Sequence, residues 1–266
     1  MSYSAADVER YVYCPMSWAL SQRGLDGIGE ALRTGEVAHA AMGSRISLWR
    51  KLLDEHYSAL RVALYLALTA ASAATLALEV VFLNAAAPFH WILILMSLTW
   101  LLIALVFLLR AMWKEDAAKD VVRANGLVEG ELMYSDLDKP GDTLRSEKYD
   151  LSGRPDYIVR KDAEYIPVEV KTGRTPDTPH DSHIMQLGVY CILVEEKYGI
   201  RPTRGVLQYP ERTFEVPFTN EFRDRVLETT LKMRWAEMTG AAHRTHNQPG
   251  KCRGCSRREA CAERLA

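Results

Sequence analysis

The chain has 266 residues, of which 25% are charged and 48% are apolar, with a formal net charge of -1. These fractions are those of an ordinary folded protein, and the length allows one large domain or two small ones. The near-zero net charge excludes a global attraction to polyanions, so any contact with nucleic acid must come from a local basic patch. Five cysteines, an odd number, and a start without the basic and apolar parts of a secretory signal argue against a disulfide framework.

The first 40 residues predict two helices. Ser4 and Asp7 form a capping-box pattern that begins a helix running through Cys14 to about Gln22. Thr34 is expected to cap a second helix, which carries His39 and continues into an apolar segment.

Two long apolar segments follow, and they predict a transmembrane helical hairpin. From Val62 to Leu83 the only charge is Glu79, and from Trp91 to Leu109 there is none. Both segments are long enough to span hydrocarbon. Lys and Arg flank the pair on both outer sides and are absent from the connecting loop, so the positive-inside rule places both flanks in the cytoplasm. A pair of buried helices in a soluble core remains the alternative, more for the first segment than for the second.

Strand-like runs separated by turns fill the next part of the chain. We expect strands at 127–134, 154–160, 165–171, 206–209 and 213–216, and helices at 181–198 and 220–238. This alternation predicts an α/β fold.

The segment Gly153-Arg-Pro-Asp156, followed by Glu169-Val-Lys171, carries the clearest chemistry. The two-residue period of a strand sends Glu169 and Lys171 to one face and the neighbouring valines to the other. A charged pair in an apolar strand is costly unless something compensates it. A divalent cation held by Asp156 and Glu169 would do so, which is the arrangement of a metal-dependent phosphodiesterase.

Two further groups accompany this motif. Gln186 and Tyr190 lie four residues apart, hence on one face of the 181–198 helix, although a polar stripe on a surface helix would read the same way. Cys252, Cys255 and Cys261 lie close together in a basic tail, and three thiolates at this spacing chelate a metal or cluster whose fourth ligand would be Cys14. Spacing alone leaves iron-sulfur and zinc open. Cys191 lies in an apolar stretch and is expected to be a buried hydrophobe.

Six motifs occur in one order along the chain: Tyr11-Val-Tyr-Cys14-Pro, Gly35-Glu-Val-Ala-His39, Gly153-Arg-Pro-Asp156, Glu169-Val-Lys171, Gln186-x-x-x-Tyr190 and the three C-terminal cysteines. This order resembles the RecB-like branch of the PD-(D/E)XK nucleases, most closely the CRISPR-associated exonucleases that carry an iron-sulfur cluster. The resemblance covers the chain except for about residues 48–124, where the hairpin is inserted.

The resemblance implies a restriction-endonuclease-like mixed central sheet flanked by helices, with a transmembrane hairpin and a C-terminal cysteine-cluster region. We expect N-terminal helices at 1–56, the hairpin at 57–114, the nuclease core at 115–240 and the cluster segment at 241–266. It also implies that Mn²⁺ or Mg²⁺ binds to His39, Asp156, Glu169 and the carbonyl of Val170. Lys171 would orient or deprotonate the attacking water, Gln186 and Tyr190 would position DNA, and a [4Fe-4S] cluster would bind to Cys14, Cys252, Cys255 and Cys261, with zinc as the alternative.

The expected function is therefore that of a membrane-anchored, metal-dependent deoxyribonuclease that acts on single-stranded DNA or free DNA ends. Its termini and nuclease domain would face the cytoplasm, and CRISPR integrase proteins are candidate partners, with spacer acquisition, repair or defence as candidate roles. The alternative is a membrane-bound iron-sulfur redox or sensing protein that binds nucleic acid without cleaving it. The retained acid and lysine at 169 and 171 favour the nuclease, because a binding module does not need them.

Overall fold

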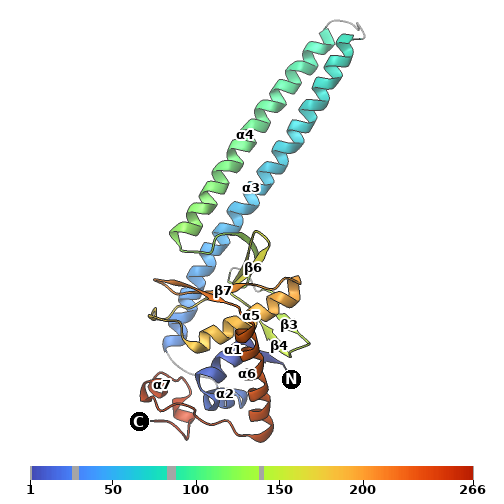
Figure 1. Ribbon diagram of the computed structural model, residues 1–266. Helices are drawn as coiled ribbons and strands as arrows, with labels where there is room; N and C mark the ends of the chain where they lie inside the picture. The colour runs from blue at the N-terminus through green and yellow to red at the C-terminus, as the bar shows by residue number, and fades with distance from the viewer. Residues whose placement is uncertain (1, 26–29, 83–87, 138–140, 266) are drawn as a thin grey trace. The chain divides into compact units, whose positions relative to one another are not determined.

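The structure, a computed structural model, describes residues 2–25, 30–82, 88–137 and 141–265; of residues 30–39 and of residue 88 it describes the backbone only. The chain forms two compact units, one made of Met1–Ile46 and Val128–Ala266 and the other of Ser47–Leu127 (Figure 1). Most of the predicted nuclease core and the cysteine-rich tail belong to the first unit, whereas residues 115–127 of that predicted core belong with the apolar hairpin to the second. The four domain boundaries expected from the sequence stay a prediction.

The first helix is shorter than predicted, because it breaks at Cys14. Helix α1 (Ala5–Tyr13) starts with the expected capping box between Ser4 and Asp7, and α2 (Pro15–Gln22) follows after one extended residue. Cys14 has φ -167° and ψ 116°, since the ring of the following proline disfavours helical geometry at the residue before it. The break places the Cys14 thiol at a corner between two helices.

A mixed five-stranded sheet forms the centre of the first unit. Its strands are β2 (Glu131–Ser135), β5 (Tyr157–Lys161), β6 (Glu164–Val170), β7 (Arg204–Gln208) and β8 (Thr213–Pro217), in the order β2-β5-β6-β7-β8. Only the β6 and β7 pair is parallel; the other neighbours are antiparallel. A parallel pair needs a long crossover, and α5 (Asp181–Tyr198) supplies it. The predicted mixed α/β fold is confirmed.

A second, smaller sheet was not predicted. It pairs β1 (Tyr3–Ser4), β4 (Leu151–Gly153) and β3 (Leu144–Ser146) in the order β1-β4-β3. These strands have two or three residues each, too few for an alternating pattern to show in the sequence.

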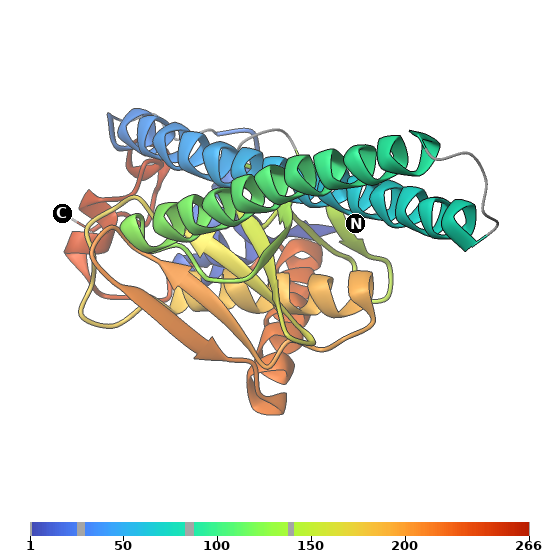
Figure 2. The same ribbon diagram turned by 90° about the horizontal axis from the view of Figure 1, so that it is seen from above.

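Helix α5 lies at the centre of the hydrophobic core. It contacts β6 and β7 of the large sheet, β3 and β4 of the small one, and helices α1 and α6 (Asn220–Thr239), and it runs beneath the sheet in the second view (Figure 2). Residues Met185 to Val194 are all buried, including Cys191, as expected for a small hydrophobe. The helix ends at Gly199 in the left-handed conformation, the usual helix C-terminus. The tail adds α7 (Pro249–Arg253) and the 3-10 turn η1 (Arg258–Ala260).

The second unit is an antiparallel helical hairpin. Helix α3 (Glu30–Phe82) begins four residues before the predicted cap at Thr34 and runs unbroken through the first apolar segment; α4 (Pro88–Ala124) begins at the predicted proline. Small residues are buried between the helices, among them Ala63, Ala70, Ala77 and Ala104, and the Ser97 hydroxyl donates to the Ala70 carbonyl at 2.9 Å. Within the described residues, these are the two helices long and apolar enough to cross a membrane.

The large apolar side chains of the hairpin point outward. Five of them are each more than half exposed: Leu64, Leu68, Leu95, Leu102 and Val106. In the most apolar stretch of each helix, only 17% of α3 and 11% of α4 is buried. Small residues inside and large apolar residues outside reverse the pattern of a soluble helical hairpin.

Candidate active site

The sheet brings Asp156 and Glu169 together. Strand β5 runs antiparallel to β6 with Tyr157 opposite Val168, so the preceding residue, Asp156, lies opposite Glu169 on the same face. The backbone N–H of Val170 donates to Oδ2 of Asp156 at 2.6 Å. Register alone therefore places two carboxyl groups side by side.

Both carboxyl groups resist ionisation. Desolvation raises the pKa of Asp156, against the lowering effect of the Val170 N–H and of Lys171. Desolvation also raises the pKa of Glu169, and the nearby charge of Asp156 raises it further. A pair of acids with raised pKa values is a frequent mark of a functional site, and a divalent cation would offset both effects.

Lys171 lies within reach of two carboxylates. Its Nζ is 3.2 Å from Oε1 of Glu169 and 3.4 Å from Oε1 of Glu9. Burial by itself lowers the pKa of Lys171, but the attraction of Glu169, Glu9 and Asp156 outweighs it and raises the pKa above the ordinary value. The side chain is therefore held as an ammonium group, suited to orienting a water molecule or stabilising negative charge.

The predicted pair on α5 does face this site, but both residues are buried. Lys171 Nζ donates to Oε1 of Gln186 at 2.5 Å, and Nε2 of Gln186 donates to the Tyr190 hydroxyl at 3.1 Å. Gln186 and Tyr190 are each 4% exposed. Their direct contacts are thus with Lys171 and with each other, and their part in positioning DNA stays a prediction.

Three residues that the sequence did not single out complete the surroundings of Lys171. Oε1 of Glu9 is 3.3 Å from Nε2 of His183, and Nδ1 of His183 is 2.7 Å from the Tyr209 hydroxyl. His183 precedes Gln186 by three residues, so the helical period places both on one face of α5, and this spacing could have indicated it. Glu9 lies on α1, far away in sequence, and had no comparable signal.

The two carboxylates, with the Val170 carbonyl, have the oxygen ligands that Mg²⁺ and Mn²⁺ prefer. Among the described residues, no group of three or more His, Cys, Asp or Glu side chains has the arrangement of a metal site. The third predicted side-chain ligand, His39, lies on the backbone of α3 but its side chain is outside the described residues. The metal ligand set therefore stays a prediction.

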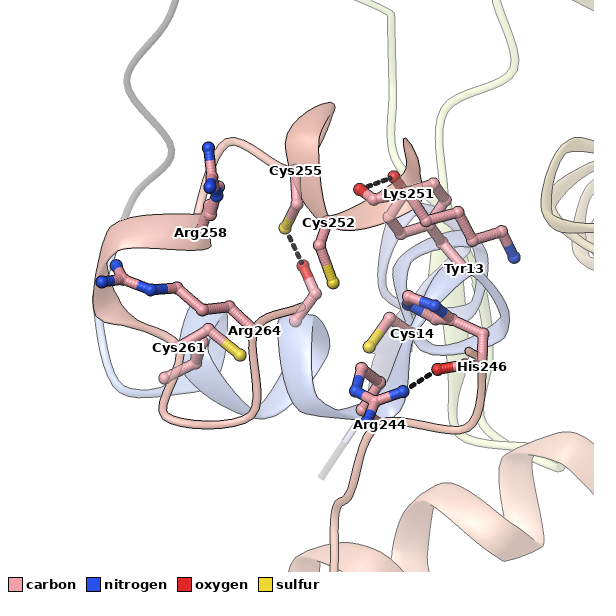
Figure 3. Close-up of a pocket in the computed structure, with 12 residues that line it drawn as sticks. Tyr13, Cys14, Arg244, His246, Lys251, Cys252, Cys255, Arg258, Cys261 and Arg264 are labelled. Carbon is pink, nitrogen blue, oxygen red and sulfur yellow. Dashed lines mark hydrogen bonds between the residues drawn. The ribbon is translucent and has the colours of Figure 1, made fainter. Parts of the chain in front are cut away.

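The four predicted cluster cysteines line one cavity at the other end of α1. Cys14 comes from the corner between α1 and α2, and Cys252, Cys255 and Cys261 come from the tail, with their thiols turned toward one space (Figure 3). The Tyr13 hydroxyl donates to the Lys251 carbonyl at 2.8 Å, which ties the first helix to the tail. The basic residues around the same cavity are Arg244, His246, Lys251, Arg258 and Arg264.

By their chemistry the donors of this cavity suit an anionic metal-thiolate group, although among the described residues the four thiols are not gathered into the arrangement of a metal site. Burial raises the pKa of the Cys14 thiol, and the neighbouring Cys255 and Cys261 raise it further, so four thiolates here need a compensating cation. Nε of Arg258 is buried, and within the described part of the chain it has no hydrogen-bond partner. A buried donor of this kind suits an acceptor such as a sulfide or a thiolate.

Comparison with known proteins agrees with this geometry. The family model of the PD-(D/E)XK nuclease superfamily matches residues 2–262. The chain belongs to the PD-(D/E)XK nuclease superfamily. Since the match runs from the first strand into the cysteine-rich tail, it includes both termini as well as the sheet.

Two curated relatives of this PD-(D/E)XK protein match at low identity. The CRISPR-associated exonuclease Cas4/endonuclease Cas1 fusion of Leptospira interrogans serogroup Icterohaemorrhagiae serovar Lai (strain 56601) is 23% identical over 173 residues, covering 59% of this chain and 32% of the relative. The CRISPR-associated exonuclease Cas4 of Francisella tularensis subsp. novicida (strain U112) is 26% identical over 87 residues, covering 33% of this chain and 43% of the relative. The matches thus span about a third and less than half of these relatives. A solved structure titled "Crystal structure of SSO0001" is 17% identical, with a TM-score of 0.34 over 82% of this chain and 96% of that one.

The two carboxyl groups predict a dependence of stability on pH when metal is withheld. Desolvation raises the pKa of Asp156 to about 7 and that of Glu169 to about 8, whereas both titrate near pH 4 in an unfolded chain. Groups with a raised folded pKa stabilise the fold fully at low pH, and this contribution is lost as pH rises through the folded values. In EDTA, the free energy of unfolding should therefore fall between pH 5 and pH 8.5. Asp156→Asn should make this fall smaller by about 1 to 2 kcal/mol, allowing for the partial exposure of Asp156.

Urea denaturation of the full chain measures this difference. The matched control is Asp181→Asn, an exposed carboxylate paired with Arg225, which should leave the pH dependence unchanged. If the free energy of unfolding changes equally with pH in Asp156→Asn and in the unsubstituted chain, Asp156 is not held protonated by its surroundings.

Proposed function

We propose that this protein is a membrane-anchored DNA nuclease that uses Mn²⁺ or Mg²⁺ to hydrolyse phosphodiester bonds at single-stranded or free DNA ends. The observation that carries the proposal is the convergence of Asp156, Glu169 and Lys171 where β5 begins and β6 ends, in a PD-(D/E)XK superfamily member. Two acids with raised pKa values beside an ammonium group have little structural value, and they suit phosphoryl chemistry.

Each residue has a distinct part in the proposed hydrolysis. Asp156 and Glu169, with the Val170 carbonyl and His39, would hold the cation. When bound, such a cation activates a water molecule and offsets the charge that develops on the scissile phosphate. Lys171, held as an ammonium group, would orient the attacking water and stabilise the phosphate oxygens. Gln186 would keep Lys171 in place through the 2.5 Å hydrogen bond.

A cavity of about 350 Å³ offers a place for the substrate, and it is connected with these residues through Tyr190, whose hydroxyl accepts from Gln186. Tyr190, Asp136 and Arg154 line it. The Arg154 guanidinium is half exposed and 3.6 Å from the Asp136 carboxylate, so its charge remains accessible to a phosphate.

The relatives support the exonuclease assignment and one candidate partner. Both are described as CRISPR-associated exonucleases, and one of them is fused to an endonuclease, Cas1. We therefore propose an integrase of the Cas1 kind as a partner, with spacer acquisition as one role; repair and defence are the others.

The hairpin supports membrane anchoring. Its two helices are long and apolar enough to span a bilayer, and its large apolar side chains are exposed. With Lys and Arg on both outer flanks and none in the connecting loop, we propose two spans with the termini and the nuclease domain in the cytoplasm.

Removing the charge of either catalytic group should abolish metal-dependent cleavage. Asp156→Asn and Lys171→Met should each lower the rate on a labelled single-stranded oligonucleotide about 1,000-fold or more in Mn²⁺. Arg160→Met, which removes an exposed cation paired with Glu131 on the neighbouring strand, is the control and should cleave normally. Undiminished cleavage by both catalytic variants would remove the assignment. Tight DNA binding without hydrolysis by the unsubstituted chain would instead favour the sensing alternative.

The cysteine cavity should hold iron. Anaerobically purified protein is expected to absorb broadly in the visible range and to contain about four irons per chain, and Cys14→Ser should lose both. The control is Cys191→Ala, a buried cysteine on α5 outside the cavity, which should keep its iron. About one zinc per chain and no colour would replace the iron-sulfur assignment with zinc, and the absence of both metals would refute a cluster.

The hairpin should place its loop across the membrane from the termini. Alkaline carbonate should not extract the protein from membranes, whereas a variant lacking residues 57–114 should be extracted. An epitope inserted after Ala86 should be reached by antibody in intact cells or spheroplasts, and a C-terminal epitope only after permeabilisation. Exposure of both epitopes on one side would contradict the proposed topology.

A further inference from the structure

Glu9 makes contacts that the proposed reaction does not yet explain. One oxygen, Oε1, lies 3.4 Å from the Lys171 ammonium and 3.3 Å from Nε2 of His183. The Glu9 side chain is 26% exposed, whereas His183 and Lys171 are 20% and 14% exposed. A single carboxylate oxygen thus joins the proposed catalytic lysine to a histidine on α5.

The partners of His183 fix which ring nitrogen carries the proton. Nδ1 is 2.7 Å from the Tyr209 hydroxyl. Burial raises the pKa of Tyr209, so this hydroxyl keeps its proton and can donate a hydrogen bond to an unprotonated Nδ1. The other ring nitrogen, Nε2, faces a carboxylate and must therefore carry the hydrogen. Burial lowers the pKa of His183 to about 3, and Lys171 and His180 add to the effect, so the ring is neutral.

Glu9 is placed by a rigid element. Helix α1 is capped at Ser4 by Asp7, and it packs along α5, the helix that carries His183 and Gln186. Lys171, which directly follows β6, consequently has Glu169 on β6, Gln186 on α5 and Glu9 on α1 as partners from three different elements. A flexible four-carbon side chain with one partner can move widely, whereas three partners confine its ammonium group.

We propose that Glu9 is a positioning residue for the nuclease reaction: its Oε1 holds the Lys171 ammonium over the Asp156 and Glu169 carboxylates, and the neutral ring of His183, oriented by the Tyr209 hydroxyl, holds Glu9. A hydrogen bond joins the Tyr209 hydroxyl to His183 Nδ1, and Oε1 of Glu9 then lies 3.3 Å from His183 Nε2 and 3.4 Å from the Lys171 ammonium. This inference rests on the proposed function, because it assigns Lys171 to the reaction.

Kinetics of cleavage test the role of Glu9. On a labelled single-stranded oligonucleotide in Mn²⁺, Glu9→Gln should lower kcat about 10- to 100-fold, because a misplaced ammonium group no longer meets the reacting phosphate. KM and the half-saturating Mn²⁺ concentration should stay within about twofold. Glu9→Asp, which keeps the charge, should recover part of the loss. His183→Phe, which keeps a ring but loses the contacts with Tyr209 and Glu9, should lower kcat in the same direction by less.

The control is Glu228→Gln, which removes a carboxylate from an exposed ion pair with Lys232 on α6; it should cleave normally. An unchanged kcat in Glu9→Gln overturns the proposal. So does a raised half-saturating Mn²⁺ concentration with an unchanged kcat at saturating metal, which would make Glu9 a metal ligand. Equal losses for Glu9→Gln and Glu9→Asp, with lowered unfolding midpoints, would make its role purely structural and also overturn it.

A measurement on the metal-free protein separates this inference from the proposed function. In ¹⁵N-imidazole NMR, His183 should be neutral with its proton on Nε2 between about pH 5 and pH 8, and Tyr209→Phe should shift the Nδ1 resonance. A proton on Nδ1 or a charged ring would refute the geometry of the chain. If the unsubstituted protein fails to cleave DNA in Mn²⁺ or Mg²⁺ while His183 shows the expected tautomer, the proposed function fails and the contact network stands.

Discussion

The groups around Asp156 and Glu169 are explained by one constraint: ionising two adjacent, poorly solvated carboxyl groups costs free energy. Asp156 and Glu169 face each other because β5 and β6 are antiparallel with a fixed register. Each raises the electrostatic cost of the other, and the surrounding groups offset it: the Val170 N–H bonded to Asp156, and the Lys171 ammonium beside Glu169. Gln186 from α5 and Glu9 from α1 then confine that ammonium. A divalent cation, as proposed, would supply further positive charge at this site.

Helix α1 connects this site with the cysteine cavity inside one unit. Glu9 reaches Lys171, and Cys14, directly after the end of the helix, lines the cavity with the three tail cysteines. The bond from the Tyr13 hydroxyl to Lys251 fixes the tail at the same corner. Joining residues so far apart in sequence has a loop-closure cost, which metal ligation at the cysteines would offset. The proposed cluster would then help to hold in place the helix that carries Glu9.

The sequence predicted the features that local patterns encode. The period of two in β6 indicated which residues share a face with Glu169. Helix α5 begins and ends at the predicted residues, and Gly199 accounts for its end. The break at Cys14 was not predicted, although Pro15 disfavours helical geometry at the residue before it. The strands β1, β3 and β4 are too short to have a period. Glu9 and Tyr209 reach the site only through tertiary packing, which no local pattern records, and the roles of the site residues stay predictions until they are measured.

Titration calorimetry with Mn²⁺ on the metal-free protein tests the central claim most directly. If Asp156 and Glu169 form the cation site, Mn²⁺ should bind near pH 7 and displace protons, because desolvation has raised the pKa of both carboxyl groups. The measured heat should then vary with the ionisation enthalpy of the buffer, and Asp156→Asn should abolish both binding and proton release. Mn²⁺ binding without proton release, or no binding at all, would contradict the account.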